Sequence, residues 1–421
     1  MAQPAQAARL AVTAIAGQGM AYLLALLLAR RLGVAGFEAY AVSGAVFVLM
    51  ATFAPRGIEK YALRALPALL ERADWAGARG FLRFGLRRTL ATALLVGAGV
   101  AAWAAWLGDL RETTRWAIVV SCAALPAGAL VHYGLEVLSA AGREVRALAL
   151  YRVATPALAL LFVGVLLALA VELSGAIAAG CWGVAWVLVL GLMALEARRA
   201  LPLAVLRAAP AQDAPLWQAE ARPFFVYRLS LALLGHTGVL ALDALQPSAA
   251  AVGAYAVAMG TVSLAAVLAT ATNRAYARRL SILLERRDFV SLQALRRERL
   301  RWLLPAVAVF LILSFAFTRE LLALFRPEFA AVGVLPLRVL AVSTAFTVLL
   351  SLAPTYLKFR QRNRATYTAV GSAAAAQGVL LLWLVPGHGA TGAALAYAIS
   401  MCSMYAAFAW MAHRELLQFK G

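Results

Sequence analysis

Three ionisable residues lie along one apolar stretch, residues 224–244, at spacings that bring them to one side of a helix. With about 100° of rotation per residue, His236 lies about 80° round the helix from Arg228, and Asp243 lies about 60° round. A charged side chain inside a membrane helix costs roughly 2.5–3.5 kcal/mol, so such residues usually face a cavity and serve a function. Arg228 could bind an anion, and His236 and Asp243 could exchange protons. Asp243 lies near the end of the stretch, where water could equally solvate it.

A second polar face runs along residues 116–141 and just beyond. His132 and Glu136 are one helical turn apart, and Ser139 and Arg143 follow at spacings of seven and eleven from His132. Such spacings place all four residues on one face of a helix. A buried His–Glu pair can take up or release a proton when water reaches it. The alternative is a neutralised pair that holds two helices together, and the sequence leaves both interpretations open.

Three further arginines, Arg56, Arg152 and Arg274, stand at the ends of apolar stretches. Arginine stays charged and binds phosphate groups through two parallel hydrogen bonds. Together with Arg228, these residues are therefore candidates for a cationic cavity that binds a phosphate. The alternative is that they extend from helix ends toward lipid headgroups. Arg338 lies inside an apolar stretch and needs a polar partner that the sequence does not identify.

The elements that must position these residues are apolar helices. Of the 421 residues, 64% are hydrophobic, and the mean hydropathy is +0.81, whereas an ordinary soluble protein is roughly half apolar. A membrane span needs about 20 residues, and long uninterrupted apolar runs favour helices over the alternating strands of a barrel. We expect an all-α polytopic membrane protein of about twelve transmembrane helices. Their expected ranges are 10–29, 38–55, 88–107, 116–141, 150–171, 175–195, 224–244, 251–273, 302–318, 332–355, 366–385 and 390–412.

Basic residues occur mainly in every second gap between the apolar stretches. The arginine-dense gaps are 56–88, 143–152, 196–228, 274–301, 358–364 and 413–420. Loops rich in Lys and Arg stay in the cytoplasm, so both termini are expected there. The first stretch is long enough to be a retained helix and not a cleaved signal. This sorting also explains the net charge of +20, so we expect no nucleic-acid partner.

The chain contains a weak internal repeat. Residues 39–42 and 254–257 both read Ala-Tyr-Ala-Val, and Ser174-Gly175-Ala176 resembles Thr391-Gly392-Ala393 at nearly the same offset. Because six helices per half is an even number, the halves would share one orientation, related by a pseudo-two-fold axis along the membrane normal. The expected domains are residues 1-196 and 223-421, each a six-helix bundle, with 197-222 as a cytoplasmic linker.

Motifs of enzymes and metal sites do not occur. The sequence has no phosphate-binding loop GxxxxGK[ST], no HExxH and no GxSxG, so neither a nucleotide, another cofactor nor a catalytic metal is expected. The cysteines Cys122, Cys181 and Cys402 lie within apolar stretches without a CxxC pair, which does not indicate a disulfide framework or a metal site. We expect a protein that is not an enzyme.

Several stretches resemble one family, the polysaccharide-transport flippases of the multidrug/oligosaccharidyl-lipid/polysaccharide (MOP) exporter superfamily. Leu28-Ala29-Arg30-Arg31-Leu32-Gly33 followed by residues 37–40 resembles the first loop of that family. The other similar stretches are 252–255, 273–279, 319–329 and 385–394. The resemblance extends in order along the whole chain, although each motif alone is weakly specific.

The resemblance implies two six-helix bundles around a cationic cavity that opens alternately to each side of the bacterial inner membrane. Members move undecaprenyl-pyrophosphate-linked oligosaccharides from the cytoplasmic to the outer leaflet, for O-antigen lipopolysaccharide or exopolysaccharide biosynthesis. A lipid-linked oligosaccharide, membrane lipids and other membrane proteins of polysaccharide assembly are the implied partners. The lipid II flippase branch typically has two additional helices, so the shorter chain resembles the O-antigen or exopolysaccharide type.

Two other functions remain as alternatives. A cation-coupled multidrug exporter of the same superfamily typically uses carboxylates inside its spans, and only Glu136 and Asp243 qualify here. A membrane polysaccharide polymerase or ligase needs a sizeable outer loop, and the longest outer gap, residues 319–331, is short.

Overall fold

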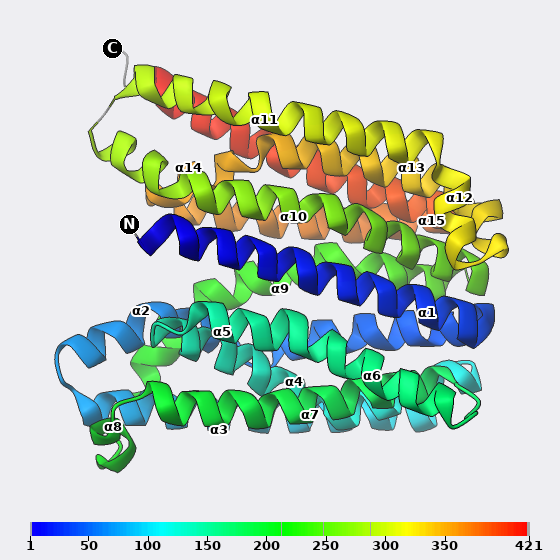
Figure 1. The fold of residues 1–421 in the computed structure, drawn as a ribbon, viewed down its shortest axis with the longest axis horizontal. Helices are drawn as coiled ribbons and strands as arrows, with labels where there is room; N and C mark the ends of the chain where they lie inside the picture. The colour runs from blue at the N-terminus through cyan, green and yellow to red at the C-terminus, as the bar shows by residue number, and fades with distance from the viewer. Residues whose placement is uncertain (1, 212, 247, 287, 419–421) are drawn as a thin grey trace. The chain divides into compact units, whose positions relative to one another are not determined.

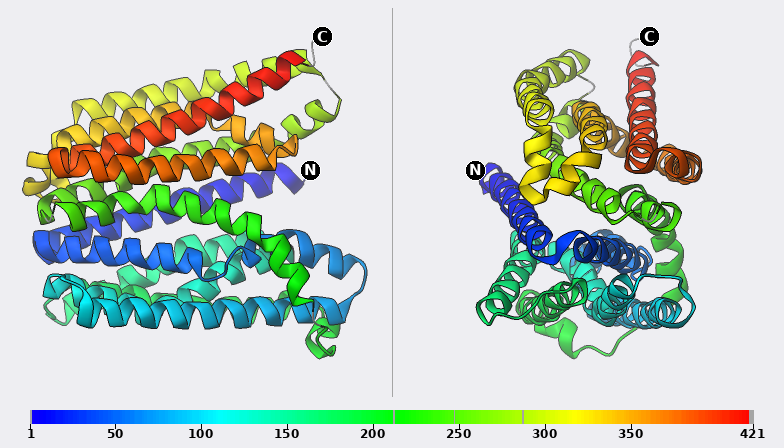
Figure 2. Two further views of the ribbon diagram at one scale, coloured as in Figure 1. Left: turned by 180° about the vertical axis from the view of Figure 1, so that it is seen from behind. Right: turned by 90° about the vertical axis from the view of Figure 1, so that its right-hand side faces the viewer.

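The computed structural model describes residues 2–211, 213–246, 248–286 and 288–418. Over these residues the secondary structure is entirely helical, with no strand. The chain divides into two compact units: an N-terminal unit, Gly19–His236, and a C-terminal unit, Thr237–Gly421 together with Met1–Gln18. Within each unit the long helices run roughly parallel to one another (Figures 1 and 2).

Helices of the N-terminal unit follow one another through short turns. They are most of α1 (Ala2–Phe53), α2 (Ile58–Glu71), α3 (Trp75–Ala102), η1 (Trp103–Leu107), α4 (Glu112–Ala140), α5 (Glu144–Ala149), η2 (Leu150–Ala154), α6 (Thr155–Ala168), α7 (Gly175–Ala200), α8 (Leu203–Arg207) and the first part of α9 (Ala214–Leu245). The segments η1 and η2 are π-helical, which is a wider winding than the α-helix.

The C-terminal unit holds the rest of α9 and six more helices. They are α10 (Ala249–Glu285), α11 (Phe289–Ala316), α12 (Thr318–Phe325), α13 (Pro327–Leu350), α14 (Leu352–Phe359) and α15 (Asn363–Gln418). Here α10 and α11 extend well beyond the expected stretches 251–273 and 302–318. The added turns are rich in Leu and Arg, which favour helix also outside the hydrocarbon core.

The number of helices agrees with the expected fold class. Ten helical segments among the described residues are long and apolar enough to cross a membrane. Two of them, Ala8–Glu71 and Asn363–Glu415, each contain a glycine with positive φ, Gly33 (φ 72°) and Gly389 (φ 53°), at which one helix ends and another begins. Counting each as two crossings gives the twelve that the sequence predicts. The chain is an all-α, multi-pass membrane protein.

Large apolar side chains cover the outside of both units. Leu95 is 75% exposed, Leu382 67% and Trp383 76%. An apolar surface of this extent is unfavourable in water but favourable in contact with lipid. Many of the buried residues are small, among them Ala129 of α4 and Ala185 of α7, two helices that pack along each other in the N-terminal unit. Small residues let helix backbones approach closely, which is the main source of packing in a bilayer.

Residues of the expected linker 197-222 pack inside the N-terminal unit. Leu201 and Val205 of the α8 region and Trp217 and Ala221 of α9 are buried in one cluster with Ile58 of α2. The two units meet in sequence at His236 and Thr237, within α9. The expected domain bounds 1-196, 197-222 and 223-421 stay predictions.

Candidate functional site

The charged side chains of the N-terminal unit converge where α2 begins. The residue before α2 is Gly57, which has a φ of 83° and lies against α9. A Cβ atom at this position would lie 2.5 Å from the backbone nitrogen of Phe225 and 3.0 Å from its Cα. Glycine therefore allows the start of α2 to reach α9, because it tolerates both the positive φ and the close approach. This contact brings Glu59 and Lys60, the second and third residues of α2, beside α9 and α4.

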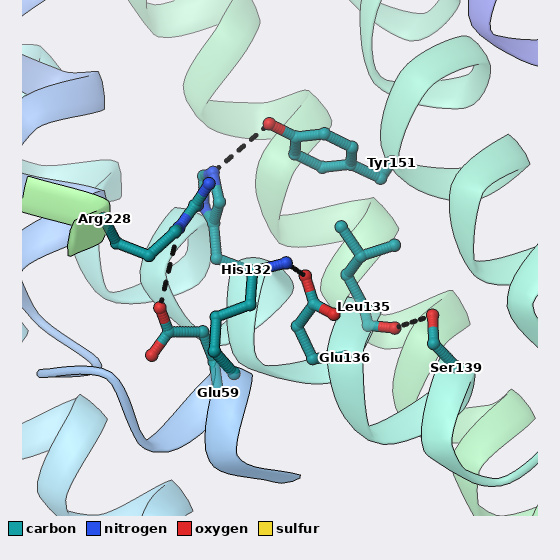
Figure 3. Close-up of polar contacts among 8 residues, drawn as sticks. Glu59, His132, Leu135, Glu136, Ser139, Tyr151 and Arg228 are labelled. Atoms are coloured by element: carbon teal, nitrogen blue, oxygen red, sulfur yellow. Dashed lines mark hydrogen bonds and ion pairs between the residues drawn. The ribbon is translucent and has the colours of Figure 1, made fainter. Parts of the chain in front are cut away.

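Two ion pairs connect α2 with these neighbours. Lys60 donates a short hydrogen bond from Nζ to Oε1 of Glu136 on α4. Arg228 on α9 places Nε 3.8 Å from Oε1 of Glu59 (Figure 3). Both carboxylates are buried, with Glu59 2% and Glu136 8% exposed. Two adjacent residues of α2 with opposite charges thus pair with two different helices: Glu59 with α9 and Lys60 with α4. Each buried carboxylate has a counter-ion, as burial requires.

His132 takes part in a separate aromatic contact. Its Nδ1 lies 2.8 Å from the carbonyl oxygen of Gly128, which can only accept, so Nδ1 carries the proton. Its Nε2 is therefore the acceptor for the hydroxyl of Tyr151, 3.2 Å away (Figure 3). The imidazole also stacks on Trp186, with ring centroids 5.8 Å apart. These contacts select one tautomer of the neutral imidazole.

In place of the expected His132–Glu136 pair, each of the two residues has other partners. Glu136 bonds to Lys60, which the sequence interpretation does not include, and His132 bonds to Gly128 and Tyr151. The Ser139 hydroxyl donates a hydrogen bond to the Leu135 carbonyl at 2.7 Å. The polar face also does not continue to Arg143, because α4 ends at Ala140 and the chain turns at Gly142, which has a φ of 79°.

Basic side chains outnumber acidic ones around this cluster. Arg152 in η2 is exposed and lies over the Tyr151 ring, 5.4 Å from its centroid. Arg152, Arg228 and Lys60 are all near enough to His132 to interact with it electrostatically. With Glu59 and Glu136 as the acids, the group carries one positive charge in excess when His132 is neutral.

The remaining arginine candidates fall in different places. Arg56 is exposed in the turn before α2, with a φ of 51°, and lies close to Arg88 of α3. Arg274 lies outside the residues whose side chains the structure describes. Arg338 has the partner that the sequence did not reveal: it donates to the Thr318 hydroxyl and the Phe315 carbonyl, each at 3.2 Å, and lies over the Phe315 ring.

The expected stripe along α9 is divided between the two units. Arg228 and His236 belong to the N-terminal unit, whereas Asp243 belongs to the C-terminal unit. His236 and Asp243 are both partly buried. Of the three, Arg228 is connected with the cluster around α2 by its ion pair with Glu59.

Sequence reasoning missed Glu59, Lys60 and Tyr151. The first two fall in the arginine-dense gap 56–88, which the charge pattern assigns to the cytoplasm as a whole. One signal was present in the sequence: Glu59, Ala62 and Leu66 share a helical face by their spacing of three and seven. All three are buried. A carboxylate on the apolar face of a short helix is the pattern that indicates a buried ion pair.

Comparison with known proteins identifies the fold. No family model and no curated protein matches this sequence. Among solved structures, the chain is similar to a multidrug resistance MATE family transporter of the MOP superfamily in an inward-facing conformation, with a TM-score of 0.75 and 13% identity over 96% of this chain and 95% of that one. An outward-facing structure of such a transporter gives a TM-score of 0.65 with 16% identity, over 98% and 96%.

A third similar structure is a MOP superfamily transporter from Pyrococcus furiosus, described as having a binding pocket of reverse polarity. It gives a TM-score of 0.65 and 12% identity over 99% of this chain and 96% of that one. These likenesses extend over nearly the whole chain and confirm the expected MATE/MOP-like fold.

Proposed function

We propose that this protein is a secondary transporter that moves an undecaprenyl-pyrophosphate-linked oligosaccharide from the cytoplasmic to the outer leaflet of the bacterial inner membrane by alternating access. The observation that carries the proposal is the charged cluster around the start of α2: Lys60 and Arg228 balance the buried Glu59 and Glu136, and the exposed Arg152 of η2 adds one positive charge. A pyrophosphate cannot cross hydrocarbon unaided, and a cationic site inside the protein compensates its charge.

Arg228 is the residue best suited to meet the substrate. Its side chain is 30% exposed, and its contact with Glu59 spans 3.8 Å, which is longer than a hydrogen bond. The guanidinium can therefore offer its planar donors to a phosphate without first breaking a close ion pair. Lys60, in contrast, is already bonded to Glu136. We assign Arg228 to substrate binding and Lys60 to holding α2 against α4.

Binding at Arg228 would also change the state of Glu59. When a phosphate takes the guanidinium, the Glu59 carboxylate loses its cation while 2% exposed, and a buried carboxylate without a partner favours protonation. A proton bound there leaves again when the phosphate departs and Arg228 returns. This exchange gives a route by which a proton gradient could drive the cycle.

The fold supports the alternating-access part of this proposal. The similar solved structures include an inward-facing and an outward-facing conformation of multidrug resistance transporters. Another is described by a binding pocket of reverse polarity and a suggested different function, so the fold is compatible with more than one kind of substrate. We propose a multi-pass location with both termini cytoplasmic, and Arg56, Arg152 and Arg274 as further phosphate contacts near the cytoplasmic entrance.

The test is to replace Arg228 by Ala in a strain that depends on this protein for glycan export. We expect export to fall at least about tenfold, because each hydrogen bond to a charged group contributes roughly 1.5–3 kcal/mol. Arg228→Lys should recover only part of the loss, since an ammonium lacks the planar fork. Arg222→Ala is the matched control, because Arg222 is an exposed arginine of the same helix.

Accumulation of the lipid-linked intermediate in the inner leaflet, together with a normal level of inserted protein, is the readout. If the Arg228→Ala protein exports glycan at the wild-type rate, Arg228 does not bind the substrate.

The buried carboxylates favour a second function, a cation-coupled multidrug exporter. Glu38, Glu59 and Glu136 are all buried in the N-terminal unit, which supplies more buried acidic groups than the sequence alone indicates. Strains with and without the protein should then differ in susceptibility to lipophilic cations such as ethidium. A drug-sensitive deletion strain with normal lipid-linked intermediates would replace the flippase proposal by this one.

A further inference from the structure

The C-terminal unit contains a cavity of about 580 Å³ that the charged cluster does not include. Its walls come from the end of α10, the first turns of α11, the junction of α13 with α14, and the last turns of α15. Figure 1 shows these helix ends together at one end of the unit. A volume of this size is within the range of pockets that hold small ligands.

One wall of the cavity is basic. Arg296 and Arg297 of α11 are exposed and line it, and His413 of α15 also lines it. The lining residues that the structure describes include no carboxylate. Glu415, two residues beyond His413, is ion-paired with Arg362 and lies 3.6 Å from Nε of Arg360. The nearby negative charge is thus compensated, and the cavity favours an anion.

A buried hydroxyl in the lining has no hydrogen-bond partner among the described residues. Tyr356 of α14 is 6% exposed and lines the cavity. Its hydroxyl makes no hydrogen bond with any described residue. A buried donor left in this way costs roughly 1–3 kcal/mol, and such a group usually has a partner. A ligand atom in the cavity would be that partner.

Arg299 also lines the cavity, and several hydrogen bonds hold its guanidinium in place. Arg299 is 2% exposed and donates from Nη2 to the Ser351 hydroxyl at 2.7 Å and to Oδ1 of Asn273 at 3.0 Å. It also donates to the carbonyls of Val348 and Leu349, each at 3.3 Å. These bonds fix α10, α11 and the end of α13 around the cavity, so its shape exists without a ligand.

The other walls are apolar. They consist mainly of leucine side chains: Leu280, Leu292, Leu300, Leu349 and Leu352. A free phosphate would gain nothing from these leucines, whereas the acyl chain of a lipid would bury them. The lining residues of α10 and α11 also belong to the arginine-dense segment 274–301, and such segments collect at the level of anionic headgroups.

We propose that this cavity binds an anionic phospholipid, whose phosphate contacts Arg296, Arg297 and the Tyr356 hydroxyl and whose acyl chains cover the leucines. Arginine forks and a neutral hydroxyl donor suit a phosphodiester, which carries one negative charge. The site lies within one unit and is independent of Arg228 and the substrate proposal. The proposed lipid site gives a role to the hydroxyl of Tyr356 and to the two adjacent arginines in the first turns of α11, Arg296 and Arg297.

The experiment measures thermal unfolding of the full-length protein, purified in detergent and freed of lipid, during titration with phosphatidylglycerol, phosphatidylcholine or inorganic phosphate. A ligand that binds only the folded state raises the midpoint with its concentration. We expect phosphatidylglycerol to raise it and the other two to leave it unchanged. Tyr356→Phe should weaken the apparent affinity about tenfold, as expected for one hydrogen bond to a charged group.

Arg296→Gln combined with Arg297→Gln should weaken binding further, and because both residues are exposed this variant keeps the fold. Arg364→Gln is the matched control, since Arg364 is an exposed arginine of the same unit that does not line the cavity. Equal shifts with phosphatidylcholine would overturn the anionic headgroup, and equal shifts with inorganic phosphate would overturn the lipid. Unchanged affinity in the Tyr356→Phe and double-arginine variants, or equal weakening in Arg364→Gln, would overturn the site.

Discussion

Glu59 and Glu136 both lie beside a cation in the N-terminal unit, but at different distances. Lys60 donates a short hydrogen bond to Glu136, whereas Nε of Arg228 remains 3.8 Å from Glu59. A carboxylate that is tightly bonded stays ionised through a cycle, and one with a loose partner can change its protonation when that partner moves. At the scale of single residues, we therefore propose Glu136 as a structural acid and Glu59 as a coupling acid.

We therefore expect Glu59→Gln and Glu136→Gln to behave differently when transport is measured in vesicles against an imposed pH gradient. Glu59→Gln should remove the response to the gradient, because glutamine cannot exchange a proton. Glu136→Gln should keep the response but destabilise the protein by about 1–3 kcal/mol, less than a fully buried pair, because Lys60 is 29% exposed. A normal gradient response in Glu59→Gln would exclude this route, and its loss in Glu136→Gln alone would restore the expected role of Glu136 in coupling.

Helix α2 connects these residues, and its position depends on the turn before it. Gly57 combines a φ of 83° with backbone atoms of Phe225 at a distance that no Cβ tolerates. If the turn moves, Glu59 and Lys60 separate from α9 and α4 together. The position of α2, more than any single charged residue, determines the geometry of the charged cluster.

Gly57→Ala should consequently destabilise the N-terminal unit by more than about 1 kcal/mol and lower transport, because alanine is strained at this φ and collides with α9. Gly99→Ala is the control: this glycine lies within α3, and a Cβ atom added there would have no neighbouring atom within 4 Å. At that position alanine should stabilise the helix by about 0.5–1 kcal/mol. Thermal unfolding in detergent measures both, and equal stability of the two variants would show that the turn tolerates a side chain.

The apolar helices were predictable from sequence because hydropathy and length decide them almost alone. The site was less predictable, for reasons visible at particular residues. Glu59 and Lys60 follow Arg56 in a basic gap, and only the folded turn at Gly57 brings them inside. The tautomer of His132 depends on the Gly128 carbonyl and on Tyr151, which comes from another helix. Hydrogen-bond partners from distant segments leave no periodic signal in the chain.

At the scale of the whole molecule, the repeat in the sequence corresponds to a packing requirement in each unit. Ala39 in the N-terminal unit and Ala254 in the C-terminal unit are both fully buried. A small residue at these places allows a neighbouring helix to approach, and Gly175 and Gly333 respectively lie against them. The two short motifs thus recur where each unit needs close helix contacts, in agreement with an origin by repetition.

We predict the orientation of the chain in the membrane from where its helices turn. In the N-terminal unit α1 turns back at the end opposite to α2 and α8, which belong to arginine-dense segments (Figure 1). Gly33 is the residue inside α1 whose φ and ψ are not helical. If the chain reverses at Gly33, residues before and after that turn return to the same side, and the positive-inside rule makes this side cytoplasmic.

Reporter fusions after Arg64 and Pro210 should then be cytoplasmic, and fusions after Leu110 and Gly387 should be outside. Fluorescent protein and alkaline phosphatase fused at the same positions give opposite signals and control for expression. A continuous first span would instead place Arg64 opposite to the N-terminus. An outside signal at Arg64 would therefore contradict the twelve-crossing arrangement and, with it, a cytoplasmic approach of the substrate to Arg228.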